Sequence, residues 1–73
     1  MTQTAAIILR HMKDNPGTAL VCTFEGGKWK VTTATVDFTG GFTPQEAQLF
    51  RDAVDELVEA GYLKQTGDSF QLA

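Results

Sequence analysis

The chain has few of the residues that build catalytic, metal or disulfide sites. Among its 73 residues there is one cysteine, Cys22, and one histidine, His11. A single cysteine excludes an internal disulfide framework and a cysteine-based zinc site, and it is typical of a protein from a reducing compartment. We therefore expect no metal, no other cofactor and a cytoplasmic location.

Leader-like and membrane-spanning segments are also missing. Residues 7–9 are apolar, but Arg10 interrupts them at once and no basic start precedes them. The sequence thus predicts neither a signal peptide nor a membrane span. Positive charge is scarce as well, since six Lys and Arg against nine Asp and Glu give a net charge of −3. That balance disfavours nucleic acid as a partner, because such binding depends on cations that neutralise phosphates.

No set of residues with catalytic spacing stands out. His11 lies near the end of a predicted helix, where an exposed, solubilising role is expected. Cys22 is predicted to face inward as a small apolar residue. The glycine pairs 26–27 and 40–41 lack the spacing of a phosphate-binding loop. The sequence therefore predicts that the protein is not an enzyme.

What the chain does contain is one strongly marked helix between Phe42 and Gly61. Thr43 is the expected N-cap, Pro44 suits the first helical position, and Glu46 completes a capping box. Gly61 can take the left-handed conformation that ends a helix. Apolar residues recur at steps of three and four and form one stripe: Phe50, Ala53, Val54, Leu57 and Val58.

The opposite side of this helix is acidic and has Arg51 as its only cation. It carries Asp52, Asp55, Glu56 and Glu59, which we call the acidic face. Like charges four residues apart destabilise a helix by ~0.2–0.5 kcal/mol per pair, so this face is not optimised for helix stability. Two interpretations remain open: a solvated face that keeps the protein soluble, and a docking surface for a basic protein partner.

The rest of the chain predicts a first helix and two hairpins. Residues Thr4–Asp14 show the helical period, with Thr2 or Thr4 as the cap. A turn at Gly26-Gly27 would pair Glu25 with Lys28, Phe24 with Trp29, Thr23 with Lys30 and Cys22 with Val31, so that the apolar pairs share one face. A turn at Gly67-Asp68 would pair Leu63 with Leu72 and Gln65 with Phe70.

The apolar alternation changes phase near Thr32-Thr33. Trp29 and Val31 are apolar at odd positions, whereas Ala34 to Phe38 are apolar at even ones. A β-bulge is the expected cause, and a break between two strands is the alternative. The whole pattern predicts a single α+β domain over residues 1–73, in the order α-β-β-α-β-β, with both helices on one face of the strands.

Two segments resemble the winged-helix family. Residues 7–17, Ile-Ile-Leu-Arg-His-Met-Lys-Asp-Asn-Pro-Gly, look like the first helix of that family and its exit. Residues 53–63, followed by Phe70-Gln71-Leu72, are similar to its recognition helix and wing hairpin. The resemblance implies a related fold in the C-terminal half and a DNA-binding transcriptional regulator. The second helix of that family is not visible, because residues 18–41 have the pattern of strands, and acids occupy the recognition-helix positions.

Two functional classes therefore remain. The first is a small non-enzymatic module that binds a protein partner through the acidic face or through a free strand edge. The alternative is a winged-helix-like DNA-binding regulator that uses five basic residues: Arg10, Lys13, Lys28, Lys30 and Lys64. Lysines on an edge strand can also simply discourage aggregation. A homodimer is a further alternative, since a small core often gains stability by association.

Overall fold

Both helices begin at the capping residues that the sequence indicates. The computed structural model describes residues 1–73, with helix α1 at Gln3–Asp14 and helix α2 at Pro44–Glu59. The Thr2 hydroxyl caps α1 by accepting a hydrogen bond from the Ala5 N–H at 3.2 Å. At α2, Thr43 Oγ1 accepts from the Glu46 N–H and Glu46 Oε1 accepts from the Thr43 N–H, at 3.2 and 3.0 Å. The predicted capping box is confirmed.

The end of α2 also follows the prediction. Gly61 has a φ of +83°, a left-handed conformation that a residue with a side chain rarely adopts. Its N–H donates to the Val58 carbonyl at 3.0 Å, and the Tyr62 N–H donates to the Leu57 carbonyl at 2.9 Å. These two bonds form a Schellman ending, which stops the helix and directs the chain into the next strand.

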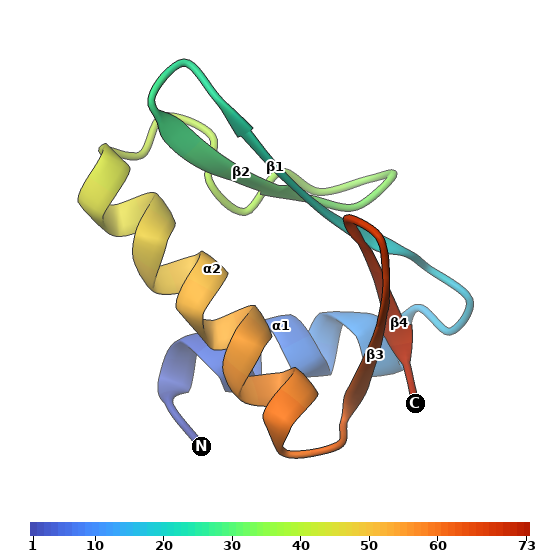
Figure 1. Ribbon diagram of the computed structural model, residues 1–73. Coiled ribbons are helices and arrows are strands. Elements are labelled where there is room, and N and C mark those ends of the chain that lie inside the picture. Colours follow the sequence, from blue (N-terminus) through green and yellow to red (C-terminus); the bar gives the residue numbers. More distant parts are fainter.

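Four strands form one antiparallel sheet in the order β2-β1-β4-β3 (Figure 1). Strands β1 (Leu20–Glu25) and β2 (Lys28–Thr32) make the first hairpin, and β3 (Leu63–Thr66) and β4 (Ser69–Leu72) make the second. Both registers are as predicted, with Phe24 opposite Trp29 and Leu63 opposite Leu72. The hairpins join through β1 and β4, where Leu20 lies opposite Phe70.

The change of phase after β2 is a chain reversal, and the expected β-bulge is absent. The Thr33 N–H donates to the Val36 carbonyl at 2.7 Å, which closes a tight turn. Residues 33–41, which we call the return segment, then run back along β2. Asp37 bridges to Thr32, and the Phe38 N–H donates to the Val31 carbonyl at 3.0 Å. The chain therefore breaks away from β2, but it does not continue as the second strand of that alternative, since one bridge is all that residues 34–38 form; no helix lies between β1 and α2.

The core lies between the sheet and the two helices. Inward residues of the strands and of both helices belong to one buried cluster: Ala5, Ile8, Leu9, Met12, Leu20, Cys22, Val31, Ala53, Val54, Leu57, Leu63 and Phe70. Because the strand members alternate in sequence, they share one face of the sheet. Both helices therefore cover that same face, as predicted, and the opposite face has no helix against it (Figure 1).

Two aromatic environments differ from expectation. Phe24 is on the core side of its strand but is 60% exposed, so it is not a core residue, and Trp29 is only half-buried. His11, expected to be exposed, is half-buried and packs edge-on against Phe38, with ring centroids 5.5 Å apart. The return segment brings Phe38 to α1, a long-range contact that the local pattern does not indicate.

Neither helix has the length and apolar composition needed to cross a bilayer.

Candidate functional site

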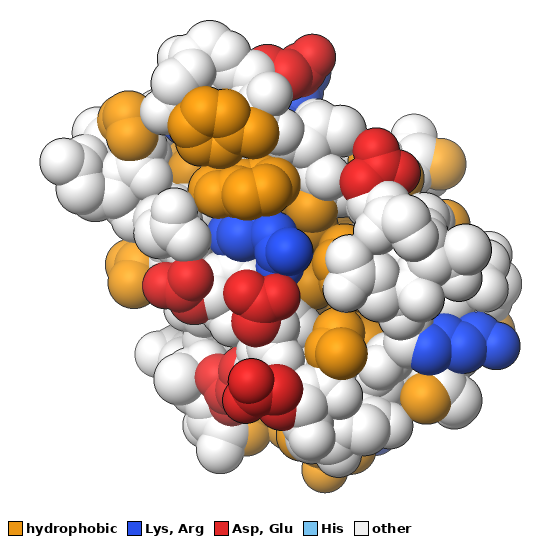
Figure 2. Space-filling model, viewed as in Figure 1, with side chains coloured by type: hydrophobic (Ala, Val, Ile, Leu, Met, Phe, Trp, Pro, Cys, Tyr) orange, Lys and Arg blue, Asp and Glu red, His pale blue; other side chains and the backbone are white.

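The four acids of the acidic face lie together along α2. Steps of three and four residues place them on one side of the helix, and Asp52, Asp55 and Glu59 are exposed while Glu56 is half-buried. Figure 2 shows acidic side chains gathered over α2, with cationic and then hydrophobic side chains above them toward the first hairpin. The predicted face is thus a continuous surface, although its members have different environments.

Asp55 binds a cation of the fold, and Glu56 binds the other helix. Asp55 forms a 2.6 Å ion pair with Arg51. Glu56 accepts hydrogen bonds from the Thr2 hydroxyl at 2.8 Å and from the Thr2 N–H at 2.9 Å. These bonds, the hydroxyl first, lower the pKa of Glu56, and they tie the start of α1 to α2. The two helices are therefore joined at the surface as well as in the core.

Asp52 and Glu59 have no cationic partner. Asp52 accepts a hydrogen bond at 2.9 Å from the Gln48 side-chain amide, which is neutral, and Glu59 forms neither a hydrogen bond nor an ion pair through its side chain. They are seven residues apart, or two helical turns, so they lie on the same side of α2. Glu56 has no ion pair either, because its donors on Thr2 are neutral, so the fully exposed carboxylates without a cation are Asp52 and Glu59.

Arg51 is not the exposed cation that the helical pattern indicates. Its side chain is 16% exposed. The guanidinium carbon lies 4.9 Å from the centroid of Trp29 and 5.5 Å from that of Phe70, and Nε is buried without a hydrogen-bond partner. The planar guanidinium suits this stacking. Arg51 therefore connects α2 to the sheet.

An exposed aromatic pair adjoins the acidic face. The rings of Phe24 and Trp29, hereafter the aromatic pair, meet edge-on at 5.4 Å with an interplanar angle of 74°. Arg51 contacts Trp29 and Asp55, so the pair and the acids are linked through one side chain. The cross-strand pairing was predicted from the sequence, but the exposure was not. The one sequence feature that indicates this exposure is the position of Phe24, which directly precedes Glu25, the last residue of β1 before the turn.

Three of the five basic residues share the helix-free face of the sheet. Alternation places Lys28, Lys30 and Lys64 on that face. Lys64 is separated from the other two by two intervening strands, or ~14 Å at ~4.8 Å per strand, so screening weakens their combined field. Lys30 pairs with Glu25 at 3.8 Å, and Lys28 Nζ donates to the Phe42 carbonyl at 2.8 Å. The predicted Glu25–Lys28 ion pair is thus replaced by a diagonal one.

The other two basic residues are on α1. Arg10 pairs with Asp14 at 3.8 Å, and Lys13 lies over the ring of Tyr62 at 5.7 Å. Arg10 and Lys13 line one small hollow on the surface, and Lys28 and Lys30 line another. The two hollows share no residue. The structure therefore distributes the basic residues over at least two surfaces.

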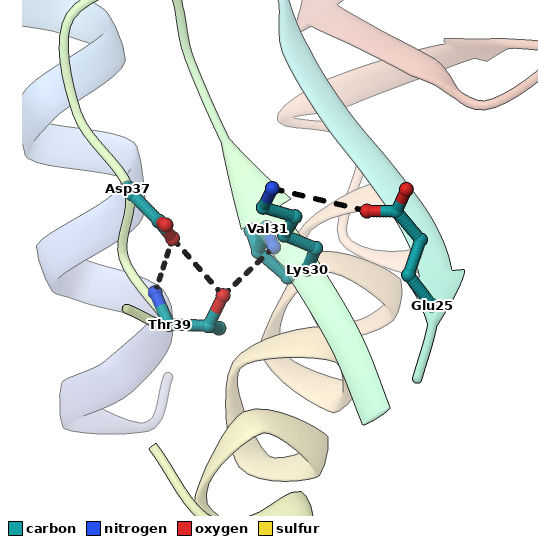
Figure 3. Close-up of polar contacts among 5 residues, drawn as sticks. All are labelled: Glu25, Lys30, Val31, Asp37 and Thr39. Carbon is teal, nitrogen blue, oxygen red and sulfur yellow. Dashed lines mark hydrogen bonds and ion pairs between the residues drawn. The ribbon is translucent and has the colours of Figure 1, made fainter. Parts of the chain in front are cut away.

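A polar hollow of about 340 Å³ lies between β2 and the return segment. Its charged lining comprises two lysines, Lys28 and Lys30, and two carboxylates, Glu25 and Asp37. Thr39 forms its wall and is 1% exposed. As Figure 3 shows, Thr39 Oγ1 accepts from the Val31 N–H and donates to Asp37, both at 3.1 Å. The balanced charge gives the hollow no preference for an anion or a cation.

The two edges of the sheet are unequal. On β2, the Val31 N–H and carbonyl point away from β1 and are bonded by the return segment. On β3, which pairs only with β4, no other segment covers the outer edge. Leu63 on this edge is buried, while Lys64, Gln65 and Thr66 are exposed. The free strand edge considered from the sequence is therefore limited to the last three residues of β3.

Cys22 is a core residue in the first hairpin. It is 4% exposed, and burial raises the pKa of its thiol to about 11. A thiol with that pKa stays protonated at neutral pH and is a poor nucleophile. No cluster of three or more His, Cys, Asp or Glu side chains has metal-binding geometry.

Comparison with known proteins finds no relative. No protein-family model, curated protein or solved structure matches the chain.

Proposed function

We propose that this protein is a small non-enzymatic interaction module that binds a basic protein segment through the acidic face of α2. The observation that carries the proposal is the pair of exposed carboxylates, Asp52 and Glu59, which have no cation beside them. Acids late in a helix oppose its dipole and repel one another. A partner that supplies Lys or Arg would reduce both the repulsion between the acids and their unfavourable interaction with the helix dipole. The arrangement therefore favours the binding of a cationic ligand.

The test is a binding titration with a defined basic peptide, Lys-Arg-Lys-Ser-Arg-Lys, carrying a fluorescent label. Charge reversal by Asp52→Lys with Glu59→Lys should abolish the change in anisotropy, and binding to the wild type should weaken as salt rises. The matched control is Glu25→Lys with Asp68→Lys, which changes the net charge equally on other surfaces. Equal loss of binding in both double variants would mean that only net charge matters and would defeat the proposal.

The alternative, a winged-helix-like DNA-binding regulator, has one observation in its favour. Lys28, Lys30 and Lys64 share the helix-free face of the sheet, and Lys64 forms no ion pair there. A titration of random duplex DNA at low and moderate salt tests it, with Lys28→Glu/Lys30→Glu as the variant. Binding that falls steeply with salt and is lost in that variant would support the regulator; no binding at low salt would exclude it.

Oligomeric state and compartment complete the proposal. A single buried thiol supports a reducing, cytoplasmic environment, and the protein is proposed to act as a monomer. Light scattering across a wide range of concentrations checks the second point, and a mass that rises toward twice the monomer value would support the homodimer instead.

A further inference from the structure

The tip of the first hairpin exposes more aromatic surface than the fold requires. Phe24 is 60% exposed, and a polar β-former such as threonine could occupy its place at the tip without loss of core. Its ring is fixed edge-on against Trp29 at 5.4 Å, and Trp29 is in turn held by the Arg51 guanidinium at 4.9 Å. The exposed ring of Phe24 therefore packs on a tryptophan that is itself packed against α2.

The acidic face begins directly beyond this pair. Arg51 contacts Trp29 on one side and Asp55 on the other, at 2.6 Å, and the Asp55 side chain remains 58% exposed. Figure 2 shows the corresponding sequence on one side of the molecule, where hydrophobic, cationic and acidic side chains follow one another without a gap. A ligand that crosses this surface meets an apolar site first and a negatively charged site next.

We propose that Phe24 and Trp29 form the apolar anchor site of the partner-binding surface, so that the partner is a basic segment with a large apolar residue adjoining its Lys and Arg residues. The inference rests on the proposed function and specifies the partner of the same surface. The apolar side chain packs on the aromatic pair, and the adjoining cations face Asp55 and Asp52. Aromatic residues are enriched in the cores of interfaces, and tryptophan is among the residue types that most often dominate the binding energy.

Charge complementarity selects this occupant over a second copy of the chain. A second copy of the chain has the same net charge of −3, so a contact between two copies at this surface is opposed by like charge. Asp52 and Glu59 have no cation to offset that repulsion, and like charges placed opposite each other disfavour a complex. A basic segment has the complementary charge and covers the same rings.

The experiment is a double-mutant cycle between the protein and two peptides, Lys-Arg-Lys-Leu-Arg-Lys and Lys-Arg-Lys-Ser-Arg-Lys. Phe24→Thr removes the exposed ring, and Ile7→Thr is the matched control because Ile7 is a 48% exposed apolar residue on α1. Affinity is measured by anisotropy, and the intrinsic fluorescence of Trp29, the only tryptophan, reports contact at the anchor site.

The leucine peptide should bind the wild type about tenfold more tightly than the serine peptide, as expected from burying one apolar side chain. It should also shift the Trp29 emission. Phe24→Thr should remove this preference while leaving binding of the serine peptide unchanged, and Ile7→Thr should retain it. Circular dichroism confirms that both variants are folded.

Two results would overturn the inference, and they differ in meaning. If Phe24→Thr retains the tenfold preference, or if the leucine peptide leaves the Trp29 emission unchanged, the anchor site is wrong although the acidic face still binds. If neither peptide binds the wild type at millimolar concentration, the proposed function fails together with the inference. A doubled molecular mass that Phe24→Thr returns to the monomer value would make a second copy the occupant instead.

Discussion

The two hairpins obey the same pairing rules, and helices pack on both, but their phenylalanines are covered to very different degrees. Each has a two-residue turn and places a phenylalanine on the core side of a strand. Phe70 in the second hairpin is 1% exposed, whereas Phe24 in the first is 60% exposed. Phe70 lies in β4 opposite Leu20, in the middle of the sheet, and Phe24 lies next to the turn at its margin.

This difference separates two properties that alternation alone does not distinguish. The pattern predicts the face on which a side chain lies, and it does so correctly in both hairpins. Whether another element covers that side chain depends on the length and position of α2, which are tertiary properties. An aromatic residue on the core side of a strand can therefore be a structural residue or a binding residue.

The largest expected difference between the two hairpins is the loss of stability when each phenylalanine is replaced in turn. Phe70→Ala should cost ~3–5 kcal/mol, as for other buried aromatic residues, out of a total stability of ~4–11 kcal/mol for a chain of this length. Phe24→Ala should cost about 1 kcal/mol, because only its contact with Trp29 is lost. Urea denaturation measures both. Similar losses in the two variants would mean that Phe24 is part of the core after all.

A second difference between the hairpins is the return segment, which covers the outer edge of the first hairpin only. Thr39→Val removes the hydroxyl that accepts from the Val31 N–H and donates to Asp37. Leaving the buried Val31 N–H without a partner should cost ~1–3 kcal/mol. Thr35→Val is the matched control, because Thr35 is exposed and only its backbone N–H is bonded. Hydrogen exchange should show faster exchange of the Val31 amide in the Thr39 variant.

If both valine variants have the same stability and Val31 exchanges at the wild-type rate, the return segment does not hold the edge. The first hairpin would then be as open as β3 is beyond Leu63, and the comparison of the two edges would lose its basis.

The elements of the fold could be predicted from local sequence, and the environments of the functional residues could not. The caps at Thr43 and Gly61 and the registers at Gly26-Gly27 and Gly67-Asp68 depend on neighbours in the chain, so the pattern determines them. The return segment depends on contacts of Phe38 with α1 and with Val31. No local period encodes such contacts, which is why a bulge was the expected explanation.

The same limit applies to the candidate site. The acidic face was predicted completely as a set of residues, because helical spacing brings the four acids together. Helical spacing does not show that Glu56 bonds Thr2, 54 positions away, or that Arg51 turns toward Trp29 and Phe70. Which acids remain free for a partner is decided by these long-range contacts.

Cys22 offers a probe of how readily the first hairpin opens. Burial raises the pKa of its thiol to about 11, so at pH 8 the folded protein has about 100-fold less thiolate than a thiol of pKa 9 would have. Labelling by a thiol reagent should therefore be about 100-fold slower in the native protein than in urea, since the thiolate is the reactive form. Thr39→Val should accelerate labelling by loosening the edge beside Val31. Labelling of native protein at the rate of denatured protein would show that Cys22 is not buried.

The smallest expected effect separates the two lysines of β2. Lys28 Nζ donates to the Phe42 carbonyl at 2.8 Å and so connects the hairpin to the start of α2, whereas Lys30 pairs with Glu25 at 3.8 Å in an exposed position. Because the hydrogen bond of Lys28 is only part-buried, it should contribute ~0.5–1.5 kcal/mol, and the exposed ion pair of Lys30 should contribute ~0–1 kcal/mol. Lys28→Met should therefore destabilise the protein more than Lys30→Met, and only the effect of Lys30→Met should disappear at high salt. Urea denaturation at two salt concentrations resolves the order. A larger destabilisation by Lys30→Met than by Lys28→Met would mean that Lys28 does not connect the hairpin to α2 in solution. The first hairpin would then be held to α2 through Arg51 and Trp29 alone.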